Sequence, residues 1–139
     1  MTVKTYTLQF PTRGHAHVVD VTGAVQKTIR ESGLMAGIVA LFVPGSTAAL
    51  TTIEYEDGAI HDFQRLFDEI IAANREYAHN ERWGDGNGHS HVRASLLGPS
   101  LTVPFVDGSL LLGTWQQIIL VDFDNRSRQR AVIAQVMGE

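Results

Sequence analysis

The chain contains no cysteine and no long run of apolar residues. Without cysteine it can form no disulfide, thiolate zinc site or cysteine nucleophile, and this composition fits a reducing cytoplasm. No apolar stretch approaches the roughly 20 residues that span a bilayer, and the N-terminus lacks the apolar core of a signal peptide. The net charge of −4 argues against a broad nucleic-acid-binding surface. We therefore expect a cytoplasmic protein that binds neither membrane nor nucleic acid.

The chain has 139 residues, 44% of them hydrophobic, which suffices for a single domain spanning residues 1–139. Residues 3–10 and 15–21 alternate in polarity around the turn signal Pro11–Gly14, so we expect these two strands to pair as a hairpin. The apolar run 37–43, which ends at Pro44-Gly45, predicts a buried strand. Further strands are expected at residues 48–55, 101–105, 109–112, 114–123 and 131–137.

Two amphipathic helices are expected between these strands. Thr22 can cap a helix that Gly33 ends. Apolar residues recur at helical spacing from Phe63 to Ile71, and Asp62 is the expected N-cap or first-turn acid. The order of elements predicts an α+β fold, a largely antiparallel sheet or sandwich with two main helices. Because residues 118–121 are apolar on both faces, one face can pack on helices and the other on a second sheet or a partner subunit.

The segment from His79 to Arg93 concentrates histidine, acid, amide and arginine side chains around three glycines. Neutral imidazole is the commonest metal ligand, so we expect His79 and His91 to converge on a divalent metal ion, zinc or magnesium. The alternative is a hydrogen-bonded pair in a polar pocket without metal. His89 would share a face with His91 on a strand but not on a helix, and the helical character of residues 94–98 favours His91 as the ligand.

Two acids and an arginine complete the candidate site. Glu54 ends a strand and Asp62 begins a helix, so either can act as general base with His79 or orient a histidine. The alternatives are an exposed strand-end charge for Glu54 and helix capping for Asp62. Arg128 can grip a phosphate through two donors, or it can belong to a solvated basic turn that pairs with Asp122 and Asp124.

Several strings of the chain match one family. They are Ser46 to Glu54, Tyr77-Ala78-His79, Asn87 to His91 followed by Ala94 to Gly98, Gly108 to Gln116, and the region of Arg128. The string Leu-Gly-Thr-Trp-Gln, in register with the upstream Asn-x-x-x-His, is specific. On these residues the chain resembles the YjbQ-like family, also called UPF0047, of secondary thiamine-phosphate synthase enzymes.

The resemblance implies an α+β fold, a homotrimer with sites near subunit boundaries, and a transfer that joins the pyrimidine and thiazole halves of thiamine phosphate. Asn87, which matches the family motif, can orient a substrate through its amide or can simply turn the chain. Gln116 can hydrogen-bond an edge of the substrate, and Arg128, which matches the family arginine, can meet its phosphate. Many members carry histidine where this chain has Gly45, and threonine where it has Ser46. Two other functions remain open: a metal-dependent hydrolase, and a non-catalytic binder of a phosphorylated metabolite or metal.

Overall fold

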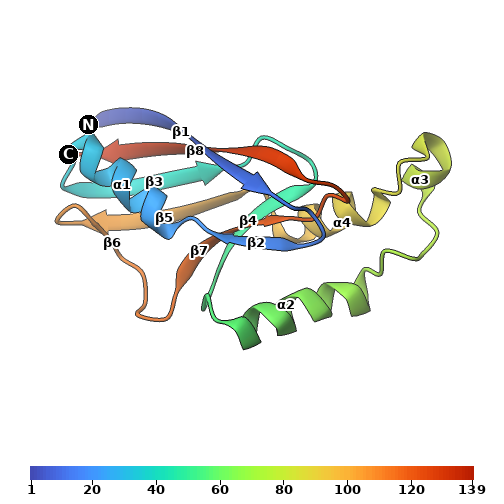
Figure 1. The fold of residues 1–139 in the computed structure, drawn as a ribbon. Helices are drawn as coiled ribbons and strands as arrows, with labels where there is room; N and C mark the ends of the chain where they lie inside the picture. Colours follow the sequence, from blue (N-terminus) through green and yellow to red (C-terminus); the bar gives the residue numbers. More distant parts are fainter.

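The chain forms eight strands and four helices in a computed structural model that describes residues 1–139. They follow in the order β1 (Thr2–Thr12), β2 (His17–Asp20), α1 (Thr22–Ser32), β3 (Ala36–Phe42), β4 (Ala48–Ile53), α2 (Asp57–Ile70), α3 (Ala78–Trp83), α4 (Gly88–Leu97), β5 (Ser100–Val106), β6 (Ser109–Leu110), β7 (Gln117–Asp122) and β8 (Arg128–Gly138). Figure 1 shows the two termini side by side at one end, with α3 and α4 at the other.

The strands form two antiparallel sheets. The larger has the order β1-β8-β3-β5-β6 and the smaller has the order β2-β7-β4. The expected α+β architecture is therefore confirmed. The expected hairpin of the first two strands is wrong, because β1 pairs along its whole length with β8, and β2 pairs with β7 in the other sheet.

The turn between β1 and β2 explains this departure. Gly14, His15 and Ala16 have φ values of 75°, 55° and 62°, so three successive residues are left-handed. The His15 N–H donates to the Asp124 carbonyl at 2.7 Å, and a Cβ on Gly14 would lie 2.5 Å from the same oxygen. The turn is thus pressed against the β7–β8 connection, and it directs the chain from one sheet into the other.

The three-stranded sheet is buried on both faces. Leu50, Ile118 and Leu120 belong to the core that it shares with α1 and the five-stranded sheet. Ile119 and Val121 belong to a second core, which includes residues of α2 and α4. The expectation that residues 118–121 pack on helices through one face and on a second sheet through the other is confirmed.

The helices begin elsewhere than expected. Helix α1 starts at Thr22, whose hydroxyl accepts the N–H of Ile118 instead of capping. Helix α2 starts at Asp57, five residues before the expected Asp62, because Glu56 caps it by accepting two backbone N–H groups. These hydrogen bonds, from Ala59 and Gly58, lower the pKa of Glu56. None of the four helices has the length and apolar character needed to cross a membrane.

Candidate functional site

The polar segment 79–93 folds as two short helices, α3 and α4, joined by a glycine-rich loop. Gly84 ends α3 in the left-handed conformation, and Gly88 begins α4. A Cβ on Gly88 would lie 2.4 Å from the Cβ of Tyr77, so only glycine permits this approach. The Gly88 N–H donates to the Asn80 side chain at 2.8 Å. The start of α4 is therefore held against the start of α3.

This crossing brings His79 and His91 together. Their ring centroids lie 4.4 Å apart with planes inclined by 46°. The Nδ1 atom of His79 is buried and lies 3.2 Å from Oδ1 of Asp85, although the contact is not aligned as a hydrogen bond. A carboxylate at Nδ1 favours the tautomer that leaves Nε2 free to accept a proton or bind a metal. The structure thus brings the two predicted imidazoles together, and the acid beside them is Asp85 instead of the predicted Glu54 or Asp62.

Asn87 is buried and locked by its neighbours. Its side-chain oxygen accepts the Ser90 hydroxyl at 2.6 Å and the Asn125 N–H at 3.1 Å. Its backbone N–H donates to Oδ1 of Asp85 at 3.1 Å. Asn87 therefore ties the histidine loop to the β7–β8 turn, and its predicted contact with substrate stays a prediction.

Beside Asn87 lies a buried network of acids and arginines. Asp122 accepts two hydrogen bonds from Arg130, at 2.7 and 2.9 Å, and Asp124 lies 3.1 Å from Nη2 of Arg128. Thr47 donates to Asp124 at 2.9 Å and accepts from Arg130 at 2.6 Å. The pairing of arginines with Asp122 and Asp124 is confirmed. The two acids, however, are almost fully buried rather than solvated.

Hydrogen bonding controls the charge of both acids. Burial alone would raise the pKa of Asp122, but hydrogen bonds from Arg130 and Thr12 outweigh it, and the pKa lies below its ordinary value. Burial likewise opposes ionisation of Asp124, yet hydrogen bonds from Asn87, Thr47 and Arg128 lower its pKa. Both acids therefore stay ionised at neutral pH, and Arg128 is already engaged by a carboxylate before any phosphate arrives.

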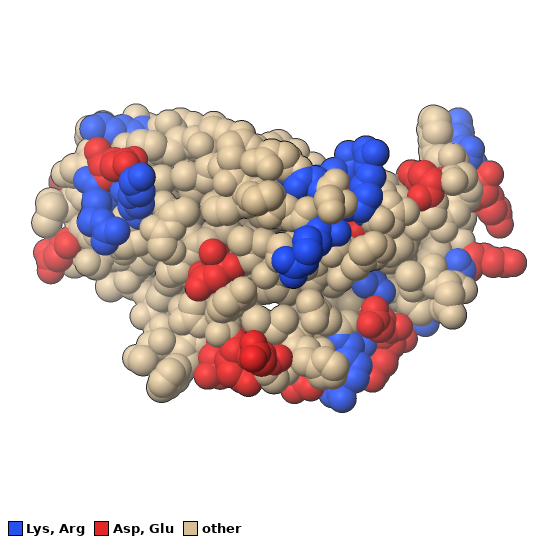
Figure 2. All heavy atoms as spheres, viewed as in Figure 1, with Lys and Arg blue, Asp and Glu red and all other residues tan.

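A hollow of about 150 Å³ opens beside His91. Gly45, Ser46 and Ser95 are among the residues that line it. A Cβ on Gly45 would lie 3.0 Å from Nη1 of Arg130, so the guanidinium occupies the space beside this glycine. Figure 2 shows basic side chains gathered near the end of β1 and the start of β8, between acidic groups on α2 and α3.

Three of the predicted site residues lie elsewhere. Asp62 is exposed on α2 and pairs with Arg65 at 3.2 Å. Ala48, at the start of β4, lines the hollow beside His91. Glu54 and Gln116 lie at the opposite end of the β4–β7 pair, about 20 Å away by strand rise. The side chain of Gln116 donates a hydrogen bond to Thr52. No three His, Asp or Glu side chains are grouped so that they could hold a metal ion. The catalytic and binding roles of these three residues stay predictions.

Sequence reasoning gave too little weight to the acids of this region. In the sequence, Asp85 can be an acid–base group or a turn former, and its place between two glycines favoured the turn former, whereas the carboxylate contacts His79. Arg93 was not singled out, but it is buried and anchors α4 to α2 through the Ile71 carbonyl and Asp68. A buried ion pair at Asp122 could have been predicted from the sequence. The residue ends a strand that is apolar on both faces, and a charge in such a place needs a partner.

His89 takes no part in the imidazole pair. It is buried near the ring of Tyr77, and its Nδ1 atom has no hydrogen-bond partner. Burial lowers the pKa of His89, and the nearby charges of Arg93 and His15 lower it further. The preference for His91 over His89 agrees with this placement.

Comparisons with known proteins agree with one another. The family model described as UPF0047 protein YjbQ-like matches residues 6–139. A UPF0047 protein from Methanothermobacter thermautotrophicus is 34% identical over 99% of this chain and 95% of its own length. The Bacillus subtilis protein YugU is 33% identical over 95% of this chain and 98% of its own. A YbjQ-like protein of unknown function from Sulfolobus solfataricus has a TM-score of 0.89 at 32% identity, covering 99% of this chain and 100% of its own.

Proposed function

Because the chain belongs to the YjbQ-like UPF0047 family, we propose that His79 and His91 form the centre of a small-molecule site for a phosphorylated metabolite. The observation that carries the proposal is the 4.4 Å separation of their ring centroids. Asp85 lies against Nδ1 of His79, and the hollow beside His91 gives a ligand access to the pair. The homotrimer implied by the family resemblance belongs to the same proposal.

The imidazole pair supplies two ligands for a divalent cation. Two imidazoles that bind one ion at about 2.1 Å with the tetrahedral angle usual for zinc place their centroids about 5.2 Å apart, so the pair at 4.4 Å has to open slightly to hold zinc. Nitrogen ligands favour zinc over magnesium, which prefers oxygen. Water and phosphate oxygens of the substrate would complete the ligand set. Such an ion supplies neutralisation of negative charge on a departing phosphate group.

The transfer implied by the resemblance makes modest demands on the protein. The bond between the pyrimidine methyl carbon and a pyrophosphate oxygen breaks, and the thiazole nitrogen forms a new bond to that carbon. When it holds no metal, His79 beside Asp85 would deliver a proton to the departing oxygen, because an imidazole nitrogen bound to a metal has no proton to give. Arg128 lies at the rim of the network and would add positive charge near the phosphate. The same residues serve a hydrolase if water replaces the thiazole nitrogen.

Zinc titration followed by calorimetry tests the site. We expect binding by the wild-type chain, and a loss of affinity of about 100-fold in His79→Ala and in His91→Ala. The matched control is His61→Ala, which removes an exposed histidine from α2. Formation of thiamine phosphate from the pyrimidine pyrophosphate and the thiazole phosphate is then assayed with zinc. Equal zinc affinity in all four proteins would end the proposal.

One observation favours a non-catalytic binder as the second candidate. Asn87 and Arg128 are both engaged by groups of the chain itself, Asn87 by Ser90 and Arg128 by Asp124. A binder requires a rigid pocket and no group free to move protons. The two candidates separate in the same assay, because a binder retains zinc and pyrophosphate without forming product or releasing phosphate.

A further inference from the structure

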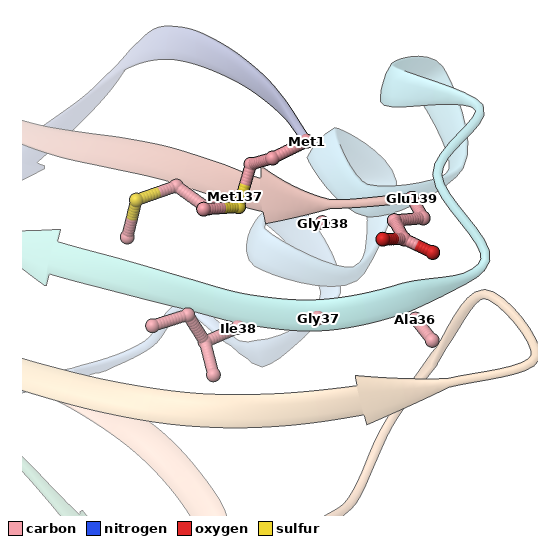
Figure 3. A pocket seen from close by; sticks show the side chains of 7 residues that line it. All are labelled: Met1, Ala36, Gly37, Ile38, Met137, Gly138 and Glu139. Atoms are coloured by element: carbon pink, nitrogen blue, oxygen red, sulfur yellow. The ribbon is translucent and has the colours of Figure 1, made fainter.

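Two hollows adjoin the start of β3. The larger, of about 440 Å³, lies beside Met1, Ile38 and Met137, and Figure 3 shows mostly apolar side chains around it. Glu139 is the only residue with a charged side chain that lines it, so it offers no opposed charges. The second, of about 310 Å³, lies between α1 and the β5–β6 turn, and we call it the α1 hollow.

The α1 hollow carries one charge of each sign. Arg30 belongs to α1 and Asp107 to the β5–β6 turn, and both are exposed residues that line the hollow. Neither takes part in an ion pair of the chain, whereas Lys27 and Glu31, also on α1, pair with each other at 3.6 Å. No acid stands three or four residues from Arg30, so no acid of α1 faces it. Two opposite charges therefore stay available to a ligand.

Hydrogen bonds fix the walls of the α1 hollow. The Gln26 side chain of α1 donates to the Gly108 carbonyl at 2.8 Å and accepts the Leu110 N–H at 3.0 Å. The Gly108 N–H donates to the Met35 carbonyl at 3.0 Å. The turn that carries Asp107 is thus tied both to α1 and to the segment that leads into β3. The backbone on each side of the hollow is therefore held in place, as it is in most small-molecule sites before the ligand binds.

The rest of the lining is mostly apolar. Ile29 and Leu34 are buried, and Met35, which is 56% exposed, adds a flexible apolar side chain. The volume of about 310 Å³ lies at the lower end of the range of small-molecule sites. A small ligand with one charge of each sign and an apolar part therefore matches this lining.

We propose that the α1 hollow binds a free α-amino acid with an apolar side chain. The Arg30 guanidinium holds the α-carboxylate, because its planar donors match the two carboxylate oxygens. The Asp107 carboxylate accepts the α-ammonium group, and Leu34 and Met35 contact the apolar side chain. The proposal is independent of the function proposed for His79, which does not line this hollow. Figure 1 shows α1 and β6 at the opposite end of the molecule from α3 and α4.

Titration of the full, isotope-labelled chain with L-leucine, followed by NMR at low salt, tests the proposal. We expect amide shifts at residues that line the hollow, such as Gly33 and Gly108, and a dissociation constant on the order of 1 mM or below. Arg30→Gln and Asp107→Asn should each raise this constant about tenfold or more. Asparagine tolerates the positive φ of Asp107, so the turn is kept. Lys27→Gln is the control, because Lys27 lies on α1 but does not line the hollow, and it should match the wild type.

Two analogues separate recognition of the charges from recognition of the apolar group. Leucinamide lacks the carboxylate and isocaproate lacks the ammonium group, so each should bind about tenfold or more weakly than leucine. The same spectra show that each variant is folded. The proposal is overturned if leucine at about 10 mM, an order of magnitude above the expected dissociation constant, shifts no residue of the hollow in the wild type. It is equally overturned if either analogue binds as tightly as leucine, or if either the Arg30 or the Asp107 variant binds leucine as tightly as Lys27→Gln does.

Discussion

The Nδ1 atom of His79 lies 3.2 Å from Oδ1 of Asp85, and the same oxygen accepts the backbone N–H of Asn87 at 3.1 Å. One carboxylate thus orients an imidazole on α3 and holds the residue that precedes α4. A carboxylate beside one ring nitrogen favours the tautomer that leaves the other ring nitrogen free to bind a metal. Asp85 therefore affects His79 through charge and affects the loop through a hydrogen bond, and the two effects can be separated.

Asp85→Asn should separate them. The amide oxygen still accepts the Asn87 N–H, so the loop keeps its backbone, but the charge beside His79 is lost. We expect zinc affinity to fall by about 10- to 100-fold with stability unchanged within about 0.5 kcal/mol. Calorimetry and urea denaturation measure the two quantities. Asp107→Asn, in the exposed β5–β6 turn, is the control. Unchanged zinc affinity in Asp85→Asn would show that the contact has no influence on the imidazole.

Gly88→Ala should disturb the histidine pair without changing either histidine. The added methyl group would lie 2.4 Å from the Cβ of Tyr77 and must push α4 away from α3. We expect a loss of about 1–3 kcal/mol in the free energy of unfolding and a parallel loss of zinc affinity. Gly23→Ala is the matched control. It lies in α1 with nothing within 4 Å of the added Cβ, so it should stabilise the protein by up to about 1 kcal/mol. Destabilisation by both substitutions would contradict the steric explanation.

Much of this architecture could be predicted from local patterns in the sequence. The apolar run 118–121 predicted a strand covered on both faces, and β7 is such a strand. The polar segment predicted that His79 and His91 converge, and their rings are in contact. Both predictions succeeded because they depend on composition within a few residues. Their outcome did not require knowledge of which distant strands pair.

The failures have a common physical cause. The pairing of β1 with β8 joins the two ends of the chain, and no local pattern encodes such a register. The apolar run 37–43 predicted a buried strand. In the structure, β3 buries one face and leaves Ile38 and Phe42 exposed on the other. Asp62 was expected to cap α2, whereas Glu56 reaches two N–H groups with a longer side chain. Tertiary geometry decided each of these cases.

Arg130→Met should be strongly destabilising. It leaves the fully buried Asp122 without the two guanidinium hydrogen bonds that keep it ionised. Breaking a buried ion pair by removing one partner costs about 3–5 kcal/mol. Arg65→Met, which breaks exposed pairs with Asp62 and Glu69, should cost less than about 1 kcal/mol. Urea denaturation of both variants decides the matter, and equal costs would mean that the buried network contributes no more than surface charges do.

Stability should fall as the pH drops below neutrality because of the buried His89. Its pKa in the folded chain lies below the ordinary 6.5, owing first to burial and then to Arg93 and His15, with Asp68 opposing. Between the folded value and 6.5 the unfolded chain binds more protons, so the free energy of unfolding rises with pH in that window. The stabilisation is complete above pH 6.5 and is lost as the pH falls through the folded pKa.

Urea denaturation at pH 7.5, 6.5 and 5.5 measures this dependence. A single histidine contributes at most about 1.4 kcal/mol per pH unit. His17 adds an effect of the same sign, because burial and Arg13 lower its pKa while Asp122 opposes them. His89→Gln should flatten the slope between pH 6.5 and 5.5. The control His61→Gln, at an exposed position, should leave it unchanged. If the His89→Gln slope equals that of the wild type, the acid sensitivity has another origin, since the carboxylates of Asp122 and Asp124 titrate only below their ordinary 3.8.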